Sequence, residues 1–250
     1  MGGNSGKLTR EKKEEKSYLL QVCEEHDGSI NCMELSEDGS VLATGSDDGN
    51  IRLWSTNSPT TDCIGILEGH EDYITCLIME DSFILSSSAD KTIRKWDMSK
   101  CECVLVFRGH ESTVNRIIST GDFLFSVSYD KKCRCWDFDT GECVRVFTGH
   151  KNNVTSVLFV PSTGEGTNEI VEFVKENKRK NQKDSKFEED PDQMYSKDII
   201  ITGSLDSTAK SWSIETGECN QTFKGHTAGV TCMANDPDGR ILFTGKNKFF

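Results

Sequence analysis

Histidine, hydroxyl and aspartate residues recur together along this chain, and they are the residue types of a Ser-His-Asp hydrolytic triad. In each set the hydroxyl residue lies four positions before the aspartate, and a tryptophan lies six positions after it. A catalytic constellation is needed once, whereas this arrangement is repeated four times, and the chain has no G-x-S-x-G nucleophile elbow. The pattern therefore favours a repeated structural unit over a catalytic centre, and we expect no enzymatic activity. The sets are His26, Thr44, Asp48 and Trp54; His70, Ser86, Asp90 and Trp96; His110, Ser126, Asp130 and Trp136; and His150, Thr202, Asp206 and Trp212.

The elements that must position these residues repeat with the same period. All five histidines and all four tryptophans recur in register, and no His or Trp lies outside the repeat. Each unit reads as a Gly-His turn, a short apolar strand such as 74–78, a strand ending in small residues, a strand ending at the tryptophan, and a fourth strand such as 144–147 or 221–223. Four short strands per unit, separated by turn signals, predict antiparallel sheet. A period of about 40–45 residues with four strands predicts the blades of a β-propeller.

The layout from Gly-His to Trp-Asp resembles the WD-repeat family. The dipeptide that names the family is present as Trp96-Asp97 and Trp136-Asp137, while the other two units depart from it with Trp54-Ser55 and Trp212-Ser213. The resemblance covers residues 18–245 apart from one insertion. It implies an all-β propeller that serves as a non-catalytic scaffold or adaptor for protein–protein interaction.

In the WD-repeat family, the histidine, hydroxyl, aspartate and tryptophan of each blade form a buried hydrogen-bonded network. The four sets above therefore become structural tetrads by resemblance. The chemistry agrees, because buried polar groups need partners. An aspartate can accept from an imidazole, the imidazole can bond the hydroxyl, and the hydroxyl can accept from the indole N–H. Each such bond contributes about 0.5–1.5 kcal/mol net.

The resemblance also implies a protein-binding rim. In the family, residues at the start of each first strand, and residues just before the tetrad aspartate, face one rim of the propeller. Two tyrosines, Tyr73 and Tyr129, are the strongest candidates for contact anchors because aromatic residues dominate binding hot spots. The candidate set is Asn31, Asp47, Tyr73, Thr75, Asn115, Tyr129, Asn153, Thr155 and Leu205.

The domain organisation follows from the repeat and its interruptions. Residues 1–17 predict a disordered charged tail, and residues 18–250 predict a partial propeller. Residues 161–196 form a charged insertion in the fourth blade that we expect to be mostly disordered, with a docking or nuclear-import segment as the alternative. N-myristoylation is left open, because the pattern requires Ser or Thr where Gly6 stands.

The fifth unit lacks the aspartate, the tryptophan and two strands. The sequence therefore predicts an incomplete propeller of four full four-stranded blades and a two-stranded fifth, whose ring this chain does not close. We interpret it as a truncated form of a seven-bladed propeller, in which uncovered blade faces could self-associate.

Composition speaks against several classes of function. A net charge of −12 speaks against nucleic-acid binding, and no apolar run reaches the length of a membrane helix. The cysteines predict reduced thiols in the cytoplasm or the nucleus, with no metal and no cofactor. The partner is expected to be another protein, whose identity the sequence does not reveal. Two alternatives stay open: a substrate receptor of a ubiquitin-ligase complex, and an RNA- or ribosome-associated factor.

Overall fold

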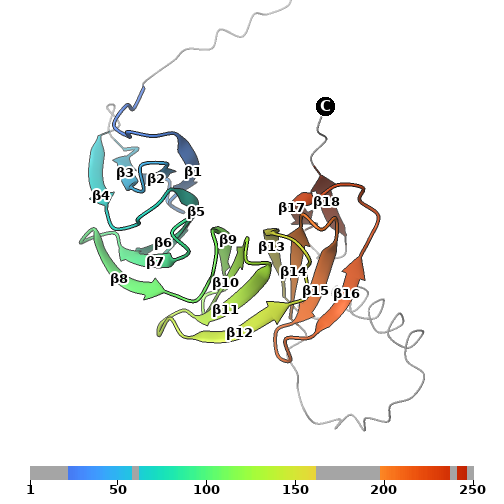
Figure 1. Cartoon of the computed structure of the whole chain (residues 1–250). Coiled ribbons are helices and arrows are strands. Elements are labelled where there is room, and N and C mark those ends of the chain that lie inside the picture. The colour runs from blue at the N-terminus through green and yellow to red at the C-terminus, as the bar shows by residue number, and fades with distance from the viewer. Residues whose placement is uncertain (1–21, 58–61, 162–197, 237–240, 247–250) are drawn as a thin grey trace, which may run out of the picture.

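The computed structural model describes residues 22–57, 62–161, 198–236 and 241–246. Within these ranges all the regular elements are β-strands, which form four four-stranded antiparallel sheets and one two-stranded sheet. The sheets follow one another along an open arc (Figure 1). The predicted fold class is confirmed: an all-β, incomplete propeller with four full blades and a two-stranded fifth.

Each blade is a meander whose strands pair in chain order. The strands of each blade are as follows: blade 1, β1 (Ile30–Leu35), β2 (Val41–Ser46), β3 (Ile51–Ser55) and β4 (Cys63–Leu67); blade 2, β5 (Ile74–Glu80), β6 (Phe83–Ser88), β7 (Ile93–Asp97) and β8 (Glu102–Phe107); blade 3, β9 (Val114–Ser119), β10 (Phe123–Ser128), β11 (Lys132–Asp137) and β12 (Cys143–Thr148); blade 4, β13 (Val154–Val160), β14 (Ile199–Ser204), β15 (Ala209–Ser213) and β16 (Cys219–Phe223); blade 5, β17 (Val230–Asn235) and β18 (Leu242–Lys246).

Strand bounds differ from the sequence prediction by up to two residues at either end. The strand predicted at 74–78 extends to Glu80 as β5, and the one predicted at 144–147 is β12, Cys143–Thr148. Residues 1–17, and the insertion from 162 onwards, lie outside the described residues, so the predictions made for them stay predictions. No helix in the described part of the chain has the length and apolar character needed to cross a bilayer.

The hydrophobic core lies between blades. One cluster joins Leu85, Ile93 and Phe107 of blade 2 to Val114 and Trp136 of blade 3, and all five side chains are almost fully buried. Equivalent clusters join blades 1 and 2, and blades 3 and 4, and a smaller one joins blades 4 and 5. The first strands of successive blades, β1, β5, β9, β13 and β17, contact one another along the arc. A blade therefore buries its apolar face only against the next blade.

Candidate functional site

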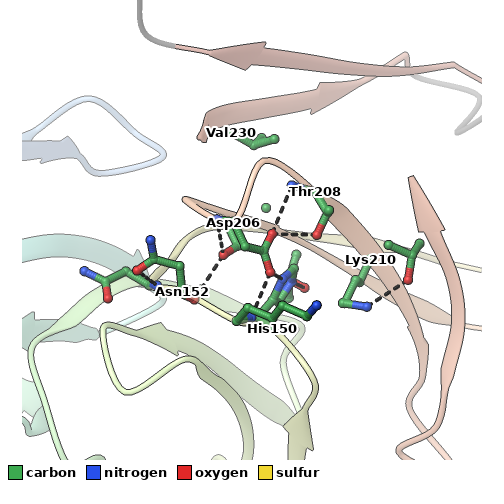
Figure 2. Close-up of polar contacts among 12 residues, drawn as sticks. His150, Asn152, Asp206, Thr208, Lys210 and Val230 are labelled. Atoms are coloured by element: carbon green, nitrogen blue, oxygen red, sulfur yellow. Dashed lines mark hydrogen bonds and ion pairs between the residues drawn. The ribbon is translucent and has the colours of Figure 1, made fainter. Parts of the chain in front are cut away.

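The structure brings together the members of all four predicted tetrads. The histidine Nδ1 lies 2.8, 2.6, 2.7 and 2.9 Å from the aspartate Oδ2 in blades 1 to 4, so Nδ1–H donates to the carboxylate. The histidine Nε2 lies 2.8, 2.7, 2.7 and 2.9 Å from the hydroxyl oxygen, which in turn accepts from the tryptophan Nε1–H at 2.7–2.8 Å. Figure 2 shows His150 and Asp206 of the fourth blade. Each hydroxyl thus links the imidazole to the indole.

The tetrad aspartate also shapes the turn between the second and third strands. In blade 2, Asp90 Oδ2 accepts the backbone N–H of Glu71 at 3.1 Å, and Oδ1 accepts the backbone N–H of Thr92 at 2.8 Å. The same two bonds form in the other three full blades. The residue after the aspartate has a positive φ in each of these blades, and only blade 1 has a glycine there, Gly49. The carboxylate therefore holds a left-handed turn for which Lys91, Lys131 and Ser207 lack the conformational freedom of glycine.

A second layer of serines, which was not predicted from the sequence, supports the same turn. A serine two positions before each tetrad aspartate accepts that aspartate's backbone N–H at 3.0–3.2 Å. In blades 2, 3 and 4 its hydroxyl also donates to a carbonyl in the turn that follows the histidine. The signal was available, because the serine recurs in register within the small-residue runs. These serines are Ser46, Ser88, Ser128 and Ser204.

Electrostatics agree with a structural role for the tetrads. Burial alone would raise the pKa of Asp206, but hydrogen bonds from Thr208, Lys151 and His150 outweigh it and lower that pKa to about 2. Burial lowers the pKa of His110 and of His150, although the partner carboxylate opposes this. His110 and His150 are therefore held neutral beside charged aspartates. The hydroxyls of Ser86, Ser126 and Thr202 are fully buried, so they are not presented to a substrate.

The fifth blade keeps a fragment of this network. His226 Nε2 lies 2.6 Å from Thr244 Oγ1, and Lys248 stands where the other blades carry the tetrad aspartate. This pair was not predicted from the sequence. The Thr-Gly dipeptide at 244–245, which also occurs at 44–45 and 202–203, was the signal that could have identified the pair.

Four of the nine candidate rim residues bond to the next blade. Asn31 Nδ2 donates to Ile74 O at 3.1 Å. The other three bonds are Thr75 to Val114 O at 2.6 Å, Asn115 to Thr155 O at 2.8 Å, and Thr155 to Val230 O at 2.5 Å. These side chains join successive inner strands, so at least some of their hydrogen-bonding groups are already paired inside the fold.

The other five candidates lie in the turns beside these strands. Tyr73, Tyr129 and Leu205 are 38%, 37% and 37% exposed, which is high for large apolar side chains. Asp47 is exposed and accepts a hydrogen bond from Asn31, while Asn153 is half-buried. The candidates at the start of a first strand and those just before a tetrad aspartate lie in one layer, because backbone hydrogen bonds join the two kinds of position. Leu205 N–H donates to Asn153 O, and Ala89 N–H donates to Tyr73 O. Their binding role stays a prediction.

A buried lysine joins blades 2 and 3, and nothing in the sequence pattern indicated it. Lys95 is 6% exposed, and its Nζ lies 4.6 Å from the ring centroid of Phe83 and 3.8 Å from that of Phe138. The ammonium also donates to Phe138 O at 3.2 Å. This cation–π contact stabilises the junction between the two blades.

Among the described residues, no group of three or more His, Cys, Asp or Glu is arranged to hold a metal ion.

Comparison with known proteins agrees with this geometry. The family model for the WD domain, G-beta repeat, matches residues 17–55, 61–97, 101–137, 141–164 and 217–248. WD repeat-containing protein 86 of Homo sapiens is 45% identical over 224 residues, which are 90% of this chain and 54% of that protein. Mitochondrial division protein 1 of Saccharomyces cerevisiae is 36% identical over 95 residues, covering 30% of this chain and 13% of that protein. The chain thus spans about half the length of the first relative and much less of the second.

Proposed function

Because the WD-repeat model matches more than half of its residues, the chain belongs to the WD-repeat family, and we propose that it acts as a non-catalytic scaffold that binds other proteins through one rim. WD-repeat proteins in general mediate protein–protein interaction. Beyond this general role, we propose that the residues of one rim make the contact with the partner protein. Fold alone does not specify a partner, because binding depends on the particular side chains that a surface presents.

The observation that carries the proposal is the exposure of Tyr73, Tyr129 and Leu205 on three successive blades. These residues lie in the turn layer held by the buried tetrads, so their backbones are fixed before a partner arrives. Rigid aromatic side chains supply contact area at low entropic cost and are enriched in binding hot spots. The three residues therefore suit a partner that presents apolar groups to the rim.

The test compares a rim variant with a control variant that removes exposed apolar side chains from another part of the fold. One carries Tyr73→Ala, Tyr129→Ala and Leu205→Ala at the rim, and the control carries Val104→Ala and Val144→Ala on the outer strands β8 and β12, where these side chains are 49% and 51% exposed. Proximity labelling in cells should show proteins that lose about tenfold or more of their enrichment with the rim variant only, as expected for loss of a hot spot. The proposal fails if no protein depends on the rim.

Two narrower roles stay predictions: a substrate receptor of a ubiquitin-ligase complex, and an RNA- or ribosome-associated factor. The same labelling experiment distinguishes them, because ubiquitin-ligase subunits or ribosomal proteins would appear among the rim-dependent proteins. We further propose the cytoplasm or the nucleus as the place of action, which localisation of a tagged chain would test.

A further inference from the structure

The fourth strand of blades 1, 2 and 3 lies against the turn that joins the third and fourth strands of the following blade. One residue of the strand, five positions before the next histidine, meets one residue of the turn, five positions after the tryptophan. We call each such pair a junction pair. One member of every junction pair is glycine. The junction pairs are Gly65 with Cys101, Leu105 with Gly141, and Arg145 with Gly217.

The first junction pair is reversed relative to the other two. A Cβ added at Gly65 would lie 2.6 Å from Cys101 Sγ, which is closer than non-bonded atoms approach. A Cβ added at Gly141 would lie 3.2 Å from Leu105 Cγ, and one added at Gly217 would lie 3.0 Å from an Arg145 carbon, Cδ. The larger residue therefore belongs to the turn at the first junction and to the strand at the other two. Two large members would collide, and two glycines would leave a void.

The backbone of Cys101 shows that its side chain is needed at the first junction. Cys101 has a φ of 54°, in a turn where blades 3 and 4 carry Gly141 and Gly217 with φ of 74° and 76°. This left-handed conformation disfavours any residue with a Cβ, so glycine would suit the turn better. The Cys101 side chain instead fills the space above Gly65 and packs against the apolar cluster that joins blades 1 and 2.

A second position also differs from one junction to the next. The residue directly before each tetrad tryptophan is the cross-strand neighbour of the strand member of the junction pair. Lys95 holds this position in blade 2, and its Nζ lies 3.8 Å from the ring centroid of Phe138 in blade 3 and donates to Phe138 O at 3.2 Å. Leu53 and Cys135 instead belong to apolar clusters. The three neighbours are Leu53 beside Gly65, Lys95 beside Leu105, and Cys135 beside Arg145.

We propose that these contacts fix the order of the blades, because each fourth strand fits the turn of the blade that follows it better than any other turn. The apolar faces cannot distinguish one blade from another, since Ile74, Val114 and Val154 occupy the same place in blades 2 to 4 and are all 0% exposed. Repeat proteins are prone to misassembly between repeats, and unfavourable contacts in the wrong arrangement are a means of preventing it. Blade 1 packed on the turn of blade 3 would set Gly65 opposite Gly141 and leave a void.

A mutant cycle on the whole chain tests the first junction pair by urea unfolding. Gly65→Leu should lower the folding equilibrium constant about tenfold or more, because the new side chain meets Cys101 Sγ. Adding Cys101→Gly should restore most of that loss. Adding Cys103→Ala is the matched control and should restore none, because Cys103 packs against the same cluster but is not the side chain above Gly65. If Gly65→Leu does not fold, Gly65→Ala provides a milder version of the same cycle.

Refolding gives a measure of blade order that packing alone would not change. The double variant Gly65→Leu with Cys101→Gly has the same arrangement of large residue and glycine at all three junctions. Blade 1 can then pack on blade 3 or blade 4 of a second copy without a void. After dilution from urea at high protein concentration, its dimer fraction should exceed that of the native chain about fivefold, as expected when a small void is filled. Size-exclusion chromatography with light scattering measures this fraction.

Three outcomes would overturn the proposal. Cys101→Gly could fail to rescue the glycine variant of blade 1, or Cys103→Ala could rescue it equally well. The native chain and the double variant could also give the same dimer fraction after refolding. Partner binding at the rim enters none of these measurements, so their failure is distinguishable from failure of the proposed function.

Discussion

The inner blades and the two ends of the arc are built from the same repeat, yet they bury its apolar residues very differently. Four positions after the histidine, Ile74, Val114, Val154 and Val230 are 0% exposed, whereas Ile30 of blade 1 is 52% exposed. Directly before the tetrad hydroxyl, Leu85 and Phe125 are 0% exposed, whereas Phe243 of blade 5 is 57% exposed. Equivalent residues thus differ only because the end faces have no neighbouring blade among the described residues.

The polar network behaves in the opposite way. The tetrad of blade 1 has the same hydrogen bonds as those of blades 2 to 4, and its Trp54 is only 3% exposed. Its members all come from one blade and the turns of that blade. The comparison therefore separates two sources of stability: networks that each blade contains by itself, and apolar packing that exists only between blades.

The largest expected effect tests the packing between blades. Phe125→Ala should lower the free energy of unfolding by about 3–5 kcal/mol, because it leaves a cavity between blades 3 and 4. Phe243→Ala removes the same side chain from an exposed face and should cost less than about 1 kcal/mol. Urea unfolding followed by tryptophan fluorescence measures both. If the two variants lost equal amounts of unfolding free energy, the face of blade 5 that carries Phe243 would be covered, and the end blades would not differ from the inner ones in packing.

The second prediction concerns the networks. Ser126→Ala leaves the indole N–H of Trp136 and the imidazole of His110 without their buried partner, and should cost about 1–3 kcal/mol. Thr244→Val in blade 5 removes one bond to a half-buried histidine and should cost less than about 1 kcal/mol. The same unfolding experiment compares them. If Ser126→Ala leaves stability unchanged, the network does not stabilise the blade.

Acid should weaken the inner blades through their histidines. Burial lowers the pKa of His110 and His150 in the folded state, so the unfolded chain takes up protons first as the pH falls through about 6.5. Their contribution to stability is therefore complete above that pH and is lost below it. A second loss follows as the pH falls from about 3.9 towards the folded pKa of Asp206, about 2. Thermal unfolding at pH 8, 7, 6 and 5 should show Tm falling below pH 7. If Tm instead rose as the pH was lowered from 8 to 5, the neutral state assigned to His110 and His150 would be wrong.

The smallest effect separates a bond between blades from an exposed rim residue. Asn115→Ala removes the bond to Thr155 O and should cost about 0.5–1.5 kcal/mol. Tyr129→Ala, at the rim of the same blade, should change stability by no more than about 0.5 kcal/mol while weakening partner binding. If Tyr129→Ala destabilised the chain more than Asn115→Ala, Tyr129 would support the fold and would not be a free contact residue.

The sequence alone determined the blade count, the all-β class and the membership of each tetrad. Those features lie within one repeat, where hairpin geometry relates sequence offset to position, so the same offset of ten residues joins the tetrad hydroxyl to the tryptophan in all four full blades. Only the tertiary structure placed Lys95 between Phe83 and Phe138 and turned Asn115 towards the next blade. Except for Lys95 and Phe83, which both belong to blade 2, these contacts join residues of different blades that lie 40 or more positions apart. Their distances depend on how whole sheets pack against one another, which the period of the repeat does not specify.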